Sequence, residues 1–291
     1  MRFLIIITLV WAFSFSLIGE FLAGRIDSYF AVLVRVALAS LVFLPFTHFR
    51  GVPTRLKQQL MLIGAVQIGA MYLFFYHAFG FLSVPEVVLF TIFTPIYVTL
   101  VYDALNRTFK PLYLISASVA VFGAYVIRYH AIDTGFMVGF LLVQGANICF
   151  AIGQSAYKKV MESHTMINQR HVFGYFHFGA LGVTGLAFVL FGNMERISPD
   201  ATQWAVLLWL GVIASGLGYF LWNKGASLVD SGVLAIMNNA LVPAGLIVNL
   251  FLWGKPANLL LLGIGSGIIG FSLWLHSYFM RHYKRASTPL C

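Results

Sequence analysis

Two stretches about half a chain apart decide the fold: YLFFYHAFGFLSVPEVVLFTIFTP at residues 72–95 and YFLWNKGASLVDSGVLAIMNNALVP at residues 219–243. Each runs from a tyrosine in one apolar span, through a short turn, to a proline inside the next span. The tyrosines are 147 residues apart and the prolines, Pro95 and Pro243, are 148 apart. Because proline removes a hydrogen bond inside a helix and kinks it, the pattern predicts two kinked helices in matching places.

The composition is that of a membrane protein. Of the 291 residues, 60% are hydrophobic and only 9% are charged, whereas a soluble domain carries about 25% charged residues. Apolar stretches of about 20 residues recur, each long enough to cross the hydrocarbon of a bilayer. We predict an all-α integral membrane protein with ten transmembrane helices, at about 3–23, 29–48, 58–81, 84–104, 111–129, 136–157, 172–192, 204–225, 230–252 and 257–280.

The spans divide into two repeats of five, residues 1–135 and 136–291. An odd number of spans turns the second repeat upside down in the membrane. Inverted repeats are how many solute carriers place one central site between two gates. The loops between spans are short and leave no room for a soluble domain, so we expect the function to lie inside the helix bundle.

The net charge of +9 follows the expected topology. If the N-terminus lies in the cytoplasm, thirteen lysines and arginines fall on the cytoplasmic side. Four fall on the opposite side: Arg25, Arg128, Arg196 and Lys255. Positive residues favour the cytoplasmic side, so this bias predicts a multi-pass protein of the cytoplasmic membrane with both termini inside. The basic residues are explained by this topology, and we expect no nucleic-acid partner.

No feature predicts a metal or another cofactor. The two cysteines, Cys149 and Cys291, cannot form a disulfide framework, and no cluster of cysteine and histidine has metal-ligand spacing. The run 265–270 spells the dinucleotide-binding pattern but lies inside a span with no strand before it, so that interpretation fails. Gly263 and Gly267 instead predict close packing, within the bundle rather than in a dimer; the protein would be a monomer or a homodimer.

Motifs spread over nearly the whole chain are similar to those of a known family. They are Trp11-Ala12-Phe13-Ser14-Phe15, Arg35 in the run 34–39, the run 149–154, Thr94-Pro95, Val242-Pro243, Gly123-Ala124-Tyr125 and the run 267–270. In their order, their spacing and their recurrence in both halves of the chain, these motifs resemble the EamA type of the drug/metabolite transporter superfamily. The resemblance implies export or exchange of small metabolites such as amino acids, amines or carboxylates. Where that family has Leu-Gly-Glu after each proline helix, this chain has Tyr102-Asp103-Ala104 and Trp253-Gly254-Lys255.

Polar and aromatic side chains within the spans are the candidate site. Polar groups are costly in hydrocarbon and usually face a cavity or one another. We predict a substrate cavity lined by Trp11, Ser14, Tyr72, Tyr76, His77, Thr91, Thr94, Asn147, Gln154, Tyr219, Trp222, Asn223, Lys224, Asn238 and Asn239, with Pro95 and Pro243 as gating positions. The alternative for any one of these residues is a hydrogen bond between helices.

The charged positions within the spans have separate interpretations. Arg35 is interpreted as a structural charge that needs partners, with Glu20, Asp103 or backbone carbonyls as candidates. His77 and Lys224 end corresponding spans and would lie near opposite mouths of one pathway. A cation there could attract a carboxylate, and a histidine could carry a coupling proton; anchoring at the membrane interface is the alternative.

These observations predict a secondary transporter that moves a small metabolite by alternating access, most readily outward or by exchange. The chain has no P-loop for ATP, so the energy would come from a gradient, including one of protons, or from exchange. A channel or membrane sensor is the alternative, but no ring of like charge or filter loop is visible. An intramembrane enzyme is less favoured, because Asp103 has no second acidic motif to pair with.

Overall fold

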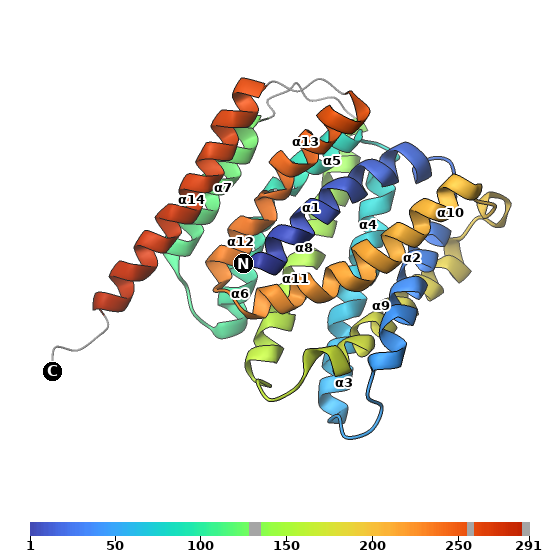
Figure 1. Cartoon of the computed structure of the whole chain (residues 1–291), viewed down its shortest axis with the longest axis horizontal. Coiled ribbons are helices and arrows are strands. Elements are labelled where there is room, and N and C mark those ends of the chain that lie inside the picture. Colours follow the sequence, from blue (N-terminus) through green and yellow to red (C-terminus); the bar gives the residue numbers. More distant parts are fainter. Residues whose placement is uncertain (128–134, 255–258, 287–291) are drawn as a thin grey trace.

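The computed structural model describes residues 1–127, 135–254 and 259–286, which are helical with short connections and contain no strand (Figure 1). This confirms the predicted all-α class. The helices are α1 (Arg2–Leu17), α2 (Ser28–Phe43), α3 (Thr54–Gly64), α4 (Met71–Ala78), α5 (Val84–Phe90), α6 (Thr94–Asn106), α7 (Pro111–Ile127), α8 (Gly135–Glu162), α9 (Gln169–Phe191), α10 (Ala201–Leu208), α11 (Gly218–Ser227), α12 (Ser231–Asn239), α13 (Leu241–Trp253) and α14 (Leu259–Ala286).

Nine segments of the described ranges are long and apolar enough to cross a membrane. Four of them join two labelled helices: α3 with α4, α5 with α6, α10 with α11, and α12 with α13. The predicted span 111–129 coincides with α7, whose apolar stretch Pro111–Gly123 is shorter than the other nine. The ten-span count therefore stays a prediction. Arg128 and Lys255, two of the four positive residues expected outside, lie beyond the described residues.

Two of the long helices contain wide, π-helical turns at matching places. The segment Ala65–Ala70 joins α3 to α4, and the segment Trp209–Leu217 joins α10 to α11. Each ends just before a tyrosine of the repeated stretch, Tyr72 or Tyr219. Short π-helical insertions occur frequently at functional sites. The wide turns set the direction in which α4 and α11 present their side chains.

The two proline-containing helices are interrupted just before the proline. A short 3-10 turn, Thr91–Phe93, separates α5 from α6, and Pro95 lies in the first turn of α6. In the same way a turn at Ala240 separates α12 from α13, which contains Pro243. Proline lacks an N–H group, and its ring displaces the carbonyl four residues earlier. Both helices break as the sequence predicts.

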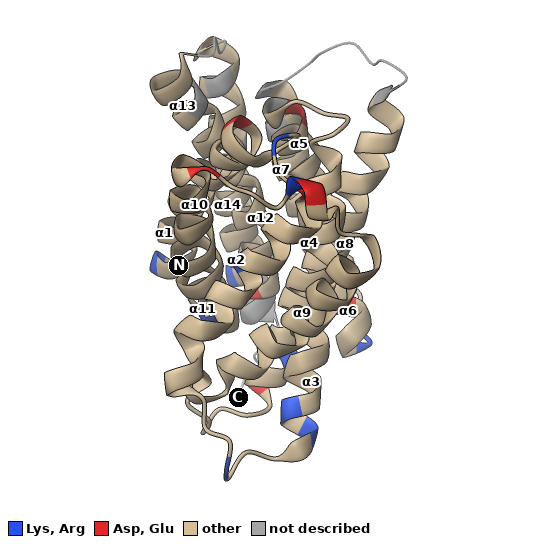
Figure 2. Ribbon diagram, turned by 90° about the vertical axis from the view of Figure 1, so that its right-hand side faces the viewer, with Lys and Arg blue, Asp and Glu red and all other residues tan. Residues whose placement is uncertain are grey.

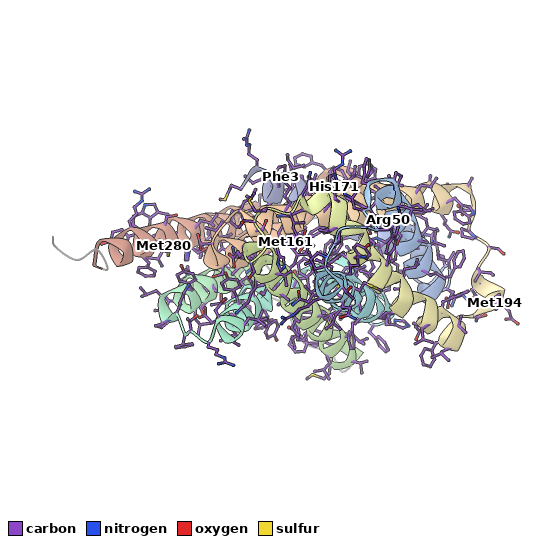
Figure 3. The ribbon with its side chains drawn as sticks, turned by 90° about the horizontal axis from the view of Figure 1, so that it is seen from below. Phe3, Arg50, Met161, His171, Met194 and Met280 are labelled. Carbon is purple, nitrogen blue, oxygen red and sulfur yellow. The ribbon has the colours of Figure 1, made fainter. Side chains whose placement is uncertain are left out.

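The packing of the first and second halves is reciprocal. Helix α1 packs against α11 and α13, while α8 packs against α4 and α6. Helices α2 and α9 contact each other, and each also packs on the π-helical turn of the other half. Helix α7 lies along α14 at one side of the bundle (Figure 1). Seen from below, Met280 on α14 and Met194 between α9 and α10 lie at opposite ends (Figure 3).

Helices α3 and α9 cross with their backbones in contact. A Cβ atom on Gly64 would lie 1.7 Å from the backbone oxygen of Phe176, and one on Gly179 would lie 1.8 Å from that of Met61. Neither position therefore has space for a side chain. The two glycines let the helices approach closely, as small residues do in membranes. On the same helix, Gly182 has no atom within 4 Å of its Cβ position.

The prediction that Gly263 and Gly267 pack within the bundle is wrong. A Cβ atom on either residue would have no neighbour within 4 Å, so these glycines lie on the open face of α14. The close contact between α7 and α14 runs through other residues. A Cβ atom on Gly123 would lie 2.9 Å from the backbone oxygen of Gly265.

Lysine and arginine gather at one end of the bundle, around the start of α3 and the connections near it (Figure 2). The other end, near α5 and the start of α10, carries acidic segments as well as basic ones (Figure 2). Asp27 and Arg196 lie at that second end, where the Asp27 backbone N–H donates to the Arg196 carbonyl across 2.9 Å. This asymmetry fits the expected positive-inside bias.

Candidate functional site: a central cavity

A cavity lies in the middle of the bundle, between α1, α2, α4, α8, α11 and the two interrupted helices. The space between its lining atoms, including the part that opens outward, is about 710 Å³. Nine residues predicted from the sequence line it: Trp11, Ser14, Tyr72, Thr91, Thr94, Asn147, Tyr219, Trp222 and Asn238. The structure adds Thr8, Phe15, Ile18, Arg35, Met71, Phe75, Ala146, Phe150 and Leu241.

Aromatic rings form one wall of the cavity. The Trp11 ring centroid is 4.8 Å from that of Trp222, 5.0 Å from that of Tyr219 and 5.7 Å from that of Phe150. The indole Nε1 of Trp11 donates a hydrogen bond to the Ala214 carbonyl across 2.9 Å. That bond fixes the ring of α1 against the π-helical turn of the second half. The wall is therefore rigid and apolar, and suits a flat ring of a ligand.

A chain of hydrogen bonds holds Trp222 in place. Its Nε1 donates to Oε1 of Gln154 across 3.0 Å, and Nε2 of Gln154 donates to Oδ1 of Asn238 across 3.3 Å. Asn238 in turn donates to the Leu234 carbonyl of its own helix. Gln154 is fully buried behind the wall and does not line the cavity. These bonds connect α8, α11 and α12 at the base of the site.

Amide side chains donate hydrogen bonds to carbonyls in the break before Pro95. Nδ2 of Asn147 donates to the Phe90 carbonyl across 2.7 Å, and Nδ2 of Asn239 donates to the Ile92 carbonyl across 3.1 Å. Buried carbonyls without a partner would be costly in a membrane. Asn147 also lines the cavity, whereas Asn239 does not. Asn239 therefore acts on the kink, between helices.

Within the same break the hydroxyl of Thr94 donates to the Thr91 carbonyl across 2.7 Å. That carbonyl is the one that the N–H of an ordinary residue at position 95 would have bonded. Gln144, on the helix of Asn147, adds a second amide to the Phe90 carbonyl across 3.1 Å. The kink is thus held by side chains of its own helix and of α8.

Arg35 lies on the cavity wall and is almost completely buried, with 3% of its surface exposed. Its Nε donates to Oγ of Ser215 across 2.6 Å and to the Leu210 carbonyl across 3.3 Å. Its Nη1 donates to the hydroxyl of Tyr76 across 3.3 Å. The guanidinium carbon is 4.2 Å from the centroid of the Tyr72 ring. Arg35 thus joins α2 to α4 and to the second half.

Of the partners predicted for Arg35, the backbone carbonyl is confirmed and the two acids are not. Among the described side chains, the ion pairs are Lys158 with Glu162 and His276 with Asp230, and none includes Arg35. Asp103 instead accepts a hydrogen bond from the backbone N–H of Lys110 across 2.7 Å.

Several predicted residues lie outside the cavity lining. They are Tyr76, His77, Gln154, Asn223, Lys224, Asn239, Pro95 and Pro243. The ring of His77 packs 4.7 Å from that of Tyr29, and its Nδ1 lies 2.6 Å from the Leu73 carbonyl. Nζ of Lys224 lies 5.5 Å from the ring centroid of Phe3. Neither cationic position therefore faces the central cavity. Asn223 is buried and accepts a hydrogen bond from Gln67.

The residues that sequence reasoning missed are mostly apolar. Phe15, Met71 and Phe75 read like any other apolar residue of a membrane span, since lipid and a cavity wall accept the same side chains. A weak signal was present for Phe15, four residues after Trp11 and therefore on the same face of the first helix. Arg35 carried the clearest signal, because an arginine inside a span has to face the interior.

A second polar cluster lies at one end of the bundle, outside the cavity. Asp230 caps α12 through the backbone N–H groups of Gly232 and Val233, and its Oδ1 lies 2.7 Å from Nε2 of His276. Burial alone would raise the pKa of Asp230. The hydrogen bond and charge of His276, together with the two backbone donors, outweigh burial and hold the pKa below its usual value.

The chain matches known proteins over most of its length. Residues 1–129 match the model of the EamA-like transporter family. A probable biotin transporter of Pseudomonas aeruginosa is 51% identical over 277 residues, which cover 95% of this chain and 97% of that protein. The biotin transporters of Salmonella typhimurium and of Escherichia coli K12 are 50% and 49% identical, over 95% of this chain and 92% of each relative.

The fold also matches a solved structure. A protein known from its crystal structure superposes with a TM-score of 0.75, covering 96% of this chain and 98% of that one. Only 15% of the aligned residues are identical, so this likeness concerns the fold alone.

Proposed function

The chain belongs to the EamA-like transporter family, and on that premise we propose that it is a secondary carrier of biotin across the cytoplasmic membrane. It is a multi-pass membrane protein and a transporter of a small metabolite, not an enzyme. Among the substrate classes expected from the sequence, biotin is a carboxylate. The relatives' names give no support to an amino acid or an amine.

The observation that carries the proposal is the central cavity. It combines a fixed aromatic wall of Trp11, Trp222 and Tyr219 with one buried cation, Arg35. Biotin has a compact ring system that carries a urea group, and a flexible acyl chain that ends in a carboxylate. A ring against the aromatic wall and polar ends at separate polar groups is the pattern expected of a small-molecule site.

We propose alternating access as the mechanism, with residues 1–135 and 136–291 as inverted repeats. Reciprocal packing of the halves, wide turns at matching places and helix breaks before Pro95 and Pro243 support it. The breaks would act as paired gates on either side of the cavity, because an interrupted helix can bend there at low cost. Both termini would lie in the cytoplasm, as the charge bias predicts.

Transport in liposomes tests the proposed function. Purified protein is reconstituted, labelled biotin is placed outside or inside, and uptake and efflux are followed with and without unlabelled biotin. We expect saturable movement that empty liposomes lack, and the two directions measure whether export or exchange is favoured. Failure of biotin to move, together with no shift of the thermal unfolding temperature by biotin, would rule out biotin as the substrate.

The same liposomes test the energy source and the topology. An imposed pH gradient should change the rate if protons are coupled to transport. His77→Gln then tests the predicted role of this histidine, which lies outside the cavity. A reporter fused to each terminus, active only in the cytoplasm, should be active at both ends. A reporter silent at one end would overturn the even number of spans.

A further inference from the structure

The central cavity contains one charged side chain among the residues that line it. That residue is Arg35, and every other lining residue is apolar, aromatic, hydroxyl-bearing or an amide. A charged side chain inside a membrane span costs roughly several kcal/mol unless polar or oppositely charged groups surround it. Because its guanidinium stays protonated at any physiological pH, the cavity carries a permanent positive charge.

The partners of Arg35 are all neutral. They are the hydroxyls of Ser215 and Tyr76, the Leu210 carbonyl and the face of the Tyr72 ring. The two ion pairs among the described residues lie elsewhere, and neither includes Arg35. The neutral partners solvate and orient the guanidinium but leave its charge uncompensated.

The geometry of these bonds leaves one side of the guanidinium for a ligand. The single N–H of Nε and one N–H of Nη1 donate to the protein. The second N–H of Nη1 and both N–H groups of Nη2 take part in none of these bonds. Ser215 is itself fixed by the hydroxyl of Tyr72, 2.9 Å from its Oγ. The guanidinium is therefore held in one orientation before any ligand arrives, which lowers the cost of binding an anion.

We infer that Arg35 is the residue that binds the carboxylate of the substrate and makes the carrier selective for anions. A planar guanidinium pairs with a carboxylate in a fixed, two-pronged geometry. With good geometry, the attraction between the two buried charges offsets the cost of taking them out of water. This inference rests on the proposed function and names the substrate class: a monocarboxylate with a neutral ring. Arg35 is then a binding residue in addition to a structural one.

The rest of the cavity suits the neutral part of such a substrate. Asn147 donates to the Phe90 carbonyl through Nδ2, and its Oδ1 accepts none of the bonds found among the described residues. An amide oxygen on the wall can accept an N–H group of a urea. The adjacent rings of Trp11 and Trp222, tilted by 36° to each other, offer the apolar surface. No second cation is needed, because the ring of the ligand carries no charge.

The test compares an acid with its neutral amide. Biotin and biotin amide have nearly the same shape, and differ in the charge that Arg35 would bind. In wild-type liposomes we expect biotin to be preferred about 10- to 100-fold, the usual range for a buried charged hydrogen bond. Arg35→Gln should lower the transport of biotin by that factor. It should leave the transport of the amide within about threefold of its wild-type value, so the preference for the acid disappears.

Two further variants separate binding from structure. Arg25→Gln removes an exposed arginine outside the cavity and should keep the wild-type preference. If Arg35→Gln does not fold, Arg35→Lys retains the charge without the two-pronged geometry and should reduce the preference by about tenfold. A merely structural arginine would lower stability or rate but would leave the ratio of acid to amide unchanged.

Failure of the inference is distinguishable from failure of the proposed function. An Arg35→Gln protein that still prefers the acid, or a wild type that moves acid and amide equally, would overturn the role of Arg35. If the wild type moves neither form of biotin, the substrate proposal fails. Thermal stabilisation by valerate and by valeramide then shows whether Arg35 binds a carboxylate. Stabilisation by valerate alone, lost in Arg35→Gln, supports the inference; equal or absent stabilisation by the two compounds refutes it.

Discussion

Asn239 and Ile92 connect the two interrupted helices of the protein at their breaks. The amide of Asn239, the last residue of α12, donates a hydrogen bond to the Ile92 carbonyl across 3.1 Å. Ile92 lies in the 3-10 turn before Pro95, and Ala240, the matching turn before Pro243, follows Asn239 directly. A carbonyl within one break therefore accepts a hydrogen bond from the residue at the edge of the other break.

Asn239→Leu should destabilise the protein and slow transport. It leaves the Ile92 carbonyl without its donor, which costs about 1–3 kcal/mol for a buried group. Because Asn239 does not line the cavity, we expect the affinity for biotin to stay near that of the wild type. Thermal unfolding and the maximal rate in liposomes measure the two effects. Thr99→Val, which removes a bond inside a single helix, is the control and should change either quantity little.

Gly179→Ala should lower stability, whereas Gly182→Ala on the same helix should not. The added methyl group at position 179 meets the backbone of Met61, so α3 and α9 must move apart, at a cost of about 1–3 kcal/mol. At position 182 there is open space, and alanine favours the helix by up to about 1 kcal/mol. Unfolding temperatures of the two variants check this. Equal values would mean that the helices do not cross as closely as described.

Trp222→Phe should weaken binding of biotin. The substitution removes the hydrogen bond to Gln154 and part of the aromatic wall, and the bond alone is worth about 1 kcal/mol, or roughly fivefold in affinity. Titration of the purified protein measures the change. Trp204→Phe removes a tryptophan that lies outside the cavity lining and should bind like the wild type. Unchanged affinity in both variants would remove Trp222 from the site.

Acid should destabilise the end of the bundle that holds Asp230. The pKa of this carboxyl is lowered in the folded protein, so its contribution to stability is present above the ordinary value of about 4. That contribution is lost as the pH falls through the lower, folded value. Unfolding temperatures of the wild type and Asp230→Asn, measured from pH 6 to 3, should converge at the acid end. A constant difference over this range would contradict the prediction.

Much of the fold could be predicted from the sequence, because the membrane enforces long apolar helices. The first expected span, 3–23, corresponds to a segment Arg2–Leu22, and the span 136–157 corresponds to Phe136–Glu162. The breaks at Pro95 and Pro243 followed from the missing N–H group. The wide turns such as Ala65–Ala70 could not be foreseen, since no residue type specifies them and they depend on the packing of neighbouring helices.

The lining of the candidate cavity was predicted in part. Polar and aromatic residues such as Trp11 and Asn147 were found, because a polar or amphipathic side chain in a membrane has to face inward. The sequence could not tell a polar residue that lines the cavity from one that holds a helix break. Asn238 does the first and its neighbour Asn239 the second. Helix rotation at the level of one residue decides between these roles, and periodicity does not resolve it.

The wide turn Trp209–Leu217 has a consequence for how this protein tolerates deletions. Each residue of an α-helix advances the chain by about 100° around its axis, so a segment with more residues per turn holds a surplus residue. Removing one amino acid there would let the segment return towards ordinary α-helical winding, so the Trp222 indole would stay near Trp11. Removing one amino acid from the regular helix between Gly218 and Trp222 would instead rotate the indole by about 100° around the axis. Elsewhere, a shortened connection such as the one near Met194 would leave that orientation intact. The wide turn is therefore the part of this helix that tolerates the loss of a residue, and the regular stretch after it is the part that does not.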